Sequence, residues 1–147
     1  VADTVIQMDC YVAKDVTEKA RALAEEVTEG KAEKRTWVKK PVTARRIEKA
    51  RVHGWDTLSF DKTEVDLRYL EQIVDETQTA ALAYIIPWLL ERAANGKRTA
   101  AELAALAEEK IRKDGLLSMV PRNYGAGAPA AVRAQEILAC LQRYRMI

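Results

Sequence analysis

The stretch YLEQIVDETQTAALAYIIPWLL, residues 69–90, contains the longest uncharged run of the chain. That run covers the eleven residues from Ala80 to Leu90 and follows the polar group Asp75-Glu76-Thr77-Gln78-Thr79. An apolar run that begins after capping residues is typical of a buried helix. The sequence therefore predicts a central helix over residues 76–96, ending near Gly96. Pro87 should kink this helix, because its ring removes a backbone donor and disfavours helical geometry at the preceding residue.

The polar group before this run has two interpretations. In the first, Asp75 accepts hydrogen bonds from the first amides of the helix and Gln78 reaches back, which makes a helix cap. In the second, the unpaired N–H groups and partial positive charge of the helix N-terminus let Gln78 and Thr79 hold a phosphate or another polar group. Asp75 would oppose such an anion. Residue chemistry favours the cap and leaves the binding site open.

Two further helices are expected after the central one. Thr99 and Glu102 have the spacing of a capping box and Gly115 provides a stop, so a helix is predicted over residues 99–115. The segment AAVRAQEILACLQRYRM, residues 130–146, should form the last helix. Its inner stripe is predicted to consist of Ala134, Ile137, Leu138, Leu141 and Tyr144.

The first half of the chain predicts strands and one surface helix. Residues 1–8, VADTVIQM, are strand-like with no turn or cap before them, so we expect a strand cut from a larger sheet. Asp15 and Glu18 should start the surface helix. Strand-like patterns on both sides of His53 and Gly54 predict a β-hairpin.

From Asp66 onward, apolar residues at helical spacing predict that the chain becomes helical. These residues are Leu67, Leu70, Ile73 and Val74. The expected fold class is α+β and predominantly α, with an N-terminal strand and a short β-hairpin followed by about four to five helices.

Composition limits the class of protein. A chain of 147 residues suffices for one compact domain, and its longest uncharged run of eleven residues is well short of the roughly 20 needed to span a membrane. Cys10 and Cys140, with a single histidine in the chain, support neither a disulfide scaffold nor a zinc site. We expect a cytoplasmic protein with free thiols and no membrane anchor.

Basic residues are concentrated in one segment. Residues 31–53 hold nine Lys and Arg against two Glu, a net charge of +7, whereas the whole chain has +2. Clustered basic residues, interleaved with Trp37 and followed by Trp55, can neutralise phosphates and offer stacking surfaces to bases. A solvated charged loop is the alternative. The predicted contacts to RNA or DNA are Lys39, Lys40, Arg45, Arg46, Lys49 and Arg51.

Common signatures of a self-contained enzyme are missing. The sequence has no GxxxxGK[ST], GxGxxG, HExxH or GxSxG motif. The GAG at Gly125 to Gly127 is interpreted as a connector, and His53 beside Gly54 as a turn histidine. We expect that this chain by itself is not a catalyst.

Several strings carry a resemblance to a known family. VADTVIQMDCY and DVTEKA, then DTLSF, VDLRYLEQIVDETQTAAL, NGKRT, DGL and EILACLQRYR resemble, in this order, the C-terminal part of the predicted ATPases of the ABC class. The resemblance runs from Val1 to about Arg145 and is most specific at Val1 to Met8 and Glu71 to Thr79. It implies an intact protein that binds and hydrolyses ATP with Mg²⁺ as a homodimer. This chain would be its C-terminal segment, without the phosphate loop and catalytic carboxylate, and would bind no cofactor alone.

The resemblance also implies candidate residues. The family string is matched here by Glu71, Gln72, Val74, Asp75, Gln78 and Thr79, and its preceding basic piece by Arg51 and Gly54. Asp75, Gln78 and Thr79 are then candidate cofactor-binding residues. Glu76 stands where the family usually has a proline, and Ala131 stands where an arginine is expected, although Arg133 is kept. If these arginines of the family contact phosphate or a partner subunit, the resemblance implies that this contact is weakened here.

The same resemblance implies a division of the chain. Residues 1–30 would end the nucleotide-binding core, which is the implied partner of this chain, residues 31–65 would form a basic linker and hairpin, and residues 66–147 a C-terminal helical domain. A nucleic-acid-binding module and an assembly module that completes a dimer are the other functional hypotheses.

Overall fold

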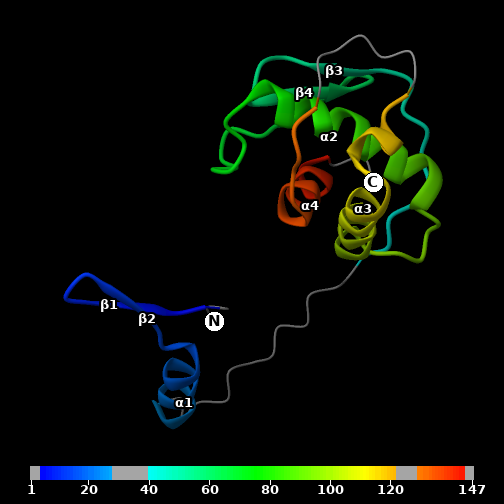
Figure 1. The fold of residues 1–147 in the computed structure, drawn as a ribbon. Helices are drawn as coiled ribbons and strands as arrows, with labels where there is room; N and C mark the ends of the chain where they lie inside the picture. The colour runs from blue at the N-terminus through cyan, green and yellow to red at the C-terminus, as the bar shows by residue number, and fades with distance from the viewer. Residues whose placement is uncertain (1–3, 28–39, 122–128, 145–147) are drawn as a thin grey trace. The chain divides into compact units, whose positions relative to one another are not determined.

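The computed structural model describes residues 4–27, 40–121 and 129–144. The chain forms two compact units, Val1–Val38 (unit 1) and Lys39–Ile147 (unit 2), and Figure 1 shows the elements of each. The fold class is α+β and predominantly helical, as predicted.

Unit 1 is a β-hairpin followed by a helix. Strand β1 (Ile6–Asp9) pairs antiparallel with β2 (Val12–Asp15), and α1 spans Thr17–Val27. The strand predicted over residues 1–8 thus has a partner within the chain, and β2 was not predicted. Cys10 and Tyr11 both have positive φ, 48° and 65°, as the central residues of a type I′ turn do. Neither is Gly or Asn, so the usual turn signal is absent.

The start of α1 is organised by Asp15. Its Oδ1 accepts a hydrogen bond from the backbone N–H of Thr17 at 2.9 Å and another from the Thr17 hydroxyl at 2.6 Å. Asp15 thus lies at the start of the surface helix as predicted, whereas the Glu18 carboxylate accepts from Arg21 at 3.0 Å.

Unit 2 begins with a three-stranded antiparallel sheet. Its strands are β3 (Ala50–Val52), β4 (Thr57–Phe60) and β5 (Thr63–Asp66), in the order β3-β4-β5. The hairpin predicted at His53 and Gly54 is confirmed, and Gly54 has the positive φ of 77° that the turn needs. Leu58, Phe60 and Val65 are buried on the face of the sheet that packs on the core.

The helix predicted from Asp66 onward is wrong. Asp66 ends β5, and the next residues form successive turns in which Leu70 N–H donates to Leu67 C=O and Ile73 N–H donates to Leu70 C=O, both at 2.9 Å. Each turn brings one apolar side chain to the core, so Leu67 and Ile73 are buried. Val74, the fourth member of the predicted stripe, is 74% exposed. The spacing of three residues reflects turns rather than a helix.

The predicted central helix is present as α2 (Glu76–Trp88), continued by the π-helical turn η1 (Leu89–Ala93). Its residues from Thr79 to Ile86 are all buried. Pro87 lies one residue before the end of α2, and the backbone changes to π-helical geometry directly after Trp88. The irregularity expected at the proline therefore lies within two residues of it.

Helix α3 (Ala100–Asp114) has the boundaries that its caps predict. Thr99 Oγ1 accepts from Glu102 N–H at 3.3 Å, Glu102 Oε2 accepts from Thr99 N–H at 2.7 Å, and Gly115 follows with φ 80°. A short 3₁₀ turn, η2 (Leu116–Met119), comes next. Helix α4 (Ala134–Arg143) is shorter than predicted, but Ile137, Leu141 and Tyr144 of its predicted inner stripe are fully buried.

The elements of unit 2 share one core. Figure 1 shows α2 between the strands on one side and α3 with α4 on the other. The rings of Phe60 and Tyr144 meet edge to face at 5.2 Å and join β4 to the C-terminal end of α4. In the described ranges, no helix has both the length and the apolar character needed to cross a membrane.

Candidate functional site

The N-terminus of α2 carries the first predicted site. Asp75 is the N-cap residue, and its Oδ1 accepts from the backbone N–H of Thr77 at 2.8 Å and from the Thr77 hydroxyl at 2.5 Å. The hydroxyl and then the backbone N–H of Thr77 lower the pKa of Asp75, because both hydrogen bonds favour the carboxylate. The predicted cap is confirmed at this residue.

Gln78 and Thr79 are engaged inside the protein as well. Gln78 Oε1 accepts from Val74 N–H at 2.9 Å and its Nε2 donates to Gln72 C=O at 3.0 Å, so the side chain reaches back over the turn before the helix. The hydroxyl of Thr79, which is fully buried, donates to the backbone C=O of Trp55. These bonds hold the helix start against residues 72–74 and against the turn between β3 and β4.

The contacts within the chain give each of the three predicted cofactor-binding residues a structural role. Asp75, Gln78 and Thr79 each have side-chain partners in the chain, and the Asp75 carboxylate occupies the helix end to which an anion would bind. Their assignment to cofactor binding stays a prediction, as does the binding of ATP and Mg²⁺ by an intact protein.

The second predicted site lies along the basic segment, defined here as residues 40–51. Backbone hydrogen bonds attach this segment to the rest of unit 2. Val42 N–H donates to Arg98 C=O at 2.7 Å, and Arg45 N–H donates to Leu90 C=O at 3.0 Å. Pro41 forms an isolated antiparallel bridge with Thr99, and the Val42 side chain is buried. The segment thus follows the molecular surface with a backbone fixed at several points.

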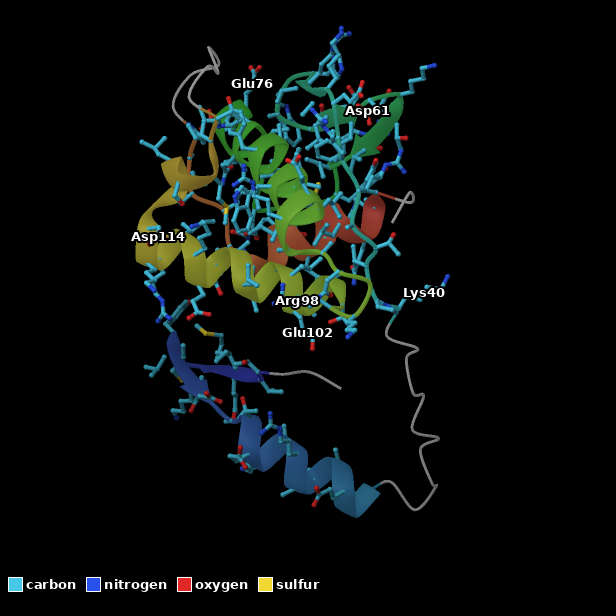
Figure 2. All side chains as sticks on the ribbon, turned by 90° about the vertical axis from the view of Figure 1, so that its right-hand side faces the viewer. Lys40, Asp61, Glu76, Arg98, Glu102 and Asp114 are labelled. Carbon is cyan, nitrogen blue, oxygen red and sulfur yellow. The ribbon has the colours of Figure 1, made fainter. Side chains whose placement is uncertain are left out.

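Most of the predicted basic residues are exposed along the basic segment. Lys40, Arg46, Lys49 and Arg51 are exposed. Arg45 is half-buried, with its guanidinium carbon 5.8 Å from the centroid of the Tyr144 ring. Figure 2 shows Lys40 and Arg98 toward one end of unit 2 and Asp61 toward the other. Lys39 and Trp37 lie outside the described residues.

Lys97 and Arg98 are basic residues that the sequence analysis did not assign to this surface. Both are exposed, and the hydrogen bond from Val42 N–H to Arg98 C=O places them beside the start of the basic segment. More than fifty positions separate them from Lys40 along the chain, so no local pattern could have grouped them.

The outer face of the sheet continues the basic segment. The register aligns Arg51 of β3 with Ser59 of β4 and Glu64 of β5. Residues 50 and 52 flank Arg51 and belong to the inner rows, with Phe60 and Leu58 as their buried partners on β4. Because side chains alternate along a strand, Arg51 lies on the outer face. His53 joins this face through a contact of 3.1 Å between its Nε2 and Ser59 Oγ.

Trp55 lies in the turn that follows β3 and is 44% exposed. The turn is held by the hydrogen bond from His53 N–H to Thr57 C=O at 2.8 Å and by the bond between the Trp55 carbonyl and the Thr79 hydroxyl. A partly exposed aromatic residue with an anchored backbone therefore follows the strand that carries Arg51.

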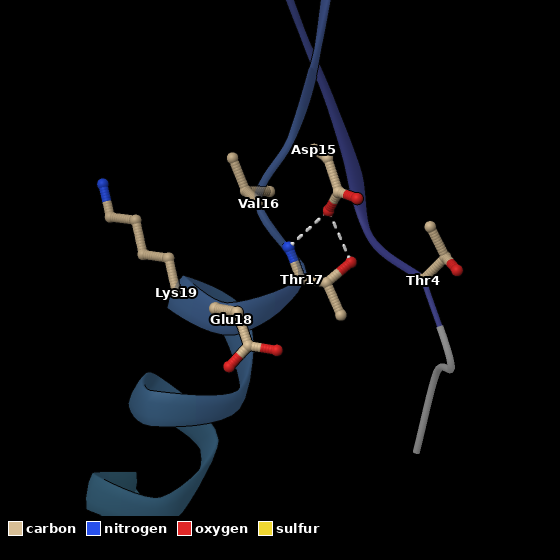
Figure 3. A pocket seen from close by; sticks show the side chains of 6 residues that line it. All are labelled: Thr4, Asp15, Val16, Thr17, Glu18 and Lys19. Carbon is tan, nitrogen blue, oxygen red and sulfur yellow. Dashed lines mark hydrogen bonds between the residues drawn. The ribbon is translucent and has the colours of Figure 1, made fainter.

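A depression in unit 1 lies at the start of α1 and is lined by Thr4, Asp15, Val16, Thr17, Glu18 and Lys19. Figure 3 shows the two hydrogen bonds from Thr17 to Asp15. The pKa of Asp15 is lowered by the Thr17 hydroxyl first and by the Thr17 N–H second. As at α2, a nearby Asp carboxylate accepts a hydrogen bond from a backbone N–H at the start of the helix.

Comparison with known proteins places the chain in a family. The family model described as the MRB1590 C-terminal domain matches residues 49–147, which is well over half of the 147 residues. A search of the curated proteins gives no match.

This match overturns the resemblance to the ATPases of the ABC class, because the model that matches is that of a different family. The assignment of the chain as a segment of an ATP-hydrolysing protein is therefore wrong. In the structure, Asp75 caps α2, Gln78 reaches back to residues 72 and 74, and Thr79 donates to Trp55 C=O. The chain belongs to the family of the MRB1590 C-terminal domain.

Proposed function

We propose that unit 2 binds nucleic acid, with RNA as the first candidate, along the basic segment. One observation carries the proposal: Lys40, Arg46, Lys49 and Arg51 are exposed, and no ion pair with another described residue involves any of them. These cations can neutralise phosphates without first giving up an acidic partner.

The charge balance of the segment supports this function. Residues 40–51 contain five Lys and Arg and a single acid, Glu48. Some described cations elsewhere in unit 2 are paired with nearby acids, as Arg68 is with Asp66 at 2.6 Å and Lys110 with Asp114 at 2.8 Å. Within residues 40–51, basic residues therefore outnumber acidic ones by five to one.

The fixed path of the segment also favours binding. Its backbone is held by Arg98, Leu90 and Thr99, and the N–H groups of Glu48 and Lys49 both donate to Asp61 Oδ1 at 3.0 Å. A ligand then meets an ordered surface and loses less free energy to the ordering of the chain. A cytoplasmic location and a homodimer stay predictions.

The test is the salt dependence of binding to a fluorescently labelled RNA of mixed sequence, measured by anisotropy. If four cations neutralise four phosphates of a single strand, log K should fall with log salt at a slope of about −3, or about 50-fold between roughly 50 and 200 mM salt. Replacing Lys49 and Arg51 together by Ala should reduce the slope by about 1.4.

The matched control removes one Lys and one Arg elsewhere. Arg112 and Lys113 are exposed on α3, and the double change to Ala there should leave the slope unchanged. No binding to RNA or DNA at low salt would contradict the proposed function, as would equal losses in the two double variants.

A further inference from the structure

We propose that the nucleic acid is bound as a single strand, with its backbone along β3 and a base stacked on Trp55. This inference rests on the proposed function and adds the class of ligand and the residue that receives the base. It is drawn from the distribution of charge over the sheet and from the exposure of Trp55.

Positive charge on the outer face is only one strand wide. Arg51 lies on β3 and Lys49 directly precedes the strand, where its C=O accepts from Asp61 N–H at 2.7 Å. Both are exposed and two positions apart, so continued alternation places them on one face with His53 beyond them. Among the described strands, β3 pairs with β4 alone, so these residues line an edge of the sheet. A single phosphodiester backbone fits a strip of this width.

The cross-strand row that contains Arg51 ends in an acidic residue on β5. Glu64 is exposed on β5 and shares a cross-strand row with Arg51, with Ser59 between them. Neighbouring strands lie about 4.8 Å apart, so the backbones at Arg51 and Glu64 are separated by about 10 Å. Asp66, two positions further along β5, forms a salt bridge of 2.6 Å with Arg68. The two charges of this pair offset each other, so it adds no net positive charge to the outer face.

A duplex fits this pattern poorly. A duplex presents two phosphate backbones, which in B-form DNA are separated by a minor groove about 6 Å wide and a major groove about 12 Å wide. With one backbone on Lys49 and Arg51, the second would approach the exposed carboxylate of Glu64, which repels phosphate and is offset only in part by Arg143 in the same depression. A single strand avoids this cost because its only backbone stays on β3.

Trp55 supplies an exposed aromatic ring on which a base of a single strand can stack. It is 44% exposed, and its backbone is fixed by the Thr79 hydroxyl and by the turn bond between His53 and Thr57. Trp55 is four positions after Arg51, a reach of at most about 13 Å. Bases of a single strand are open to stacking on such a ring, whereas those of a duplex are already stacked on one another.

The experiment compares one labelled 15-nucleotide strand, as RNA and as DNA, with the same strand annealed to its complement, using the full chain. Single strands of either kind should bind at least tenfold more tightly than the duplexes at equal salt. Trp55→Ala should weaken single-strand binding by about 5- to 150-fold, the range that base stacking spans. Trp55→Phe should recover most of the loss, since a ring remains.

Two further variants separate stacking from a general change of the surface. Tyr69 is 81% exposed and follows β5, so Tyr69→Ala is the matched loss of an exposed ring and should leave binding unchanged. Glu64→Gln should raise duplex affinity more than single-strand affinity, because it removes the charge that opposes the second backbone.

The outcomes distinguish this inference from the proposed function. Duplex binding as tight as single-strand binding overturns the single-strand assignment alone, as does Trp55→Ala with unchanged affinity in a chain that still responds to the Lys49 and Arg51 changes. A chain that binds neither form at low salt overturns the proposed function itself. Circular dichroism of each variant confirms that the loss is not one of folding.

Discussion

The buried hydroxyl of Thr79 joins the first turn of α2 to the turn between β3 and β4. Its hydrogen bond to the Trp55 carbonyl connects a residue of the capping string with one more than twenty positions earlier. The sequence predicted the capping role of Asp75 because a cap depends on residues two or three positions away. It could not predict the partner of Thr79, because that contact exists only after the sheet packs on α2.

Asp66 gives a pH-dependent prediction at the same scale. Hydrogen bonds from the Arg68 side chain first and its backbone N–H second lower the pKa of Asp66 from 3.8 to about 2. A carboxyl whose folded-state pKa is depressed stabilises the fold above its unfolded pKa, and this contribution is lost as pH falls. Asp66→Asn should therefore flatten the fall in stability between about pH 4 and pH 2.

The measurement is urea unfolding of both proteins across that range. Glu64→Gln is the control, since Glu64 is exposed on the same strand and forms no ion pair within the described part of the chain. An unchanged pH dependence in Asp66→Asn would show that the carboxyl contributes nothing to the acid sensitivity.

At the scale of elements, the sequence predicted helix boundaries well where capping residues mark them, and poorly where the only signal was apolar spacing. Helix α3 begins and ends where Thr99, Glu102 and Gly115 predicted. The turns after β5 were predicted as a helix, because Leu67, Leu70 and Ile73 repeat at a spacing common to helices and to consecutive turns. Strand β2 was missed because the turn at Cys10 and Tyr11 has no glycine.

The capping box of α3 provides the prediction at this scale. Thr99→Ala should lower the free energy of unfolding by about 1 kcal/mol, because Glu102 N–H loses its side-chain acceptor at the helix start. Thr99→Ser keeps the acceptor and should retain most of the stability. Urea unfolding measures both, and equal losses in the two variants would contradict a capping role.

At the scale of the molecule, the hydrophobic core belongs to one unit. All its buried residues lie from Val42 to Tyr144, inside unit 2. In unit 1, Ile6, Met8, Val12 and Leu23 are more than half exposed. A two-stranded hairpin with so little burial contributes little to stability.

Removal of residues 1–38 should therefore leave unit 2 folded. The midpoint of thermal unfolding should change by less than about 4 °C, which for a domain of this size corresponds to roughly 1 kcal/mol or less. A single cooperative transition followed by circular dichroism is the expected result. Loss of that transition would show that unit 2 depends on residues 1–38.

The amino-acid sequence alone determined the features that depend on near neighbours or on composition. These are the apolar central helix, the caps of α2 and α3, the hairpin at Gly54, the α+β class and the concentration of basic charge in residues 31–53. Only the tertiary structure decided which side chains share a surface. The register that aligns Arg51 with Glu64, the placement of Lys97 and Arg98 beside Val42, and the anchoring of Trp55 by Thr79 all join distant positions. Such pairings are set when the sheet and the helices bury a common core, and no short-range pattern encodes them.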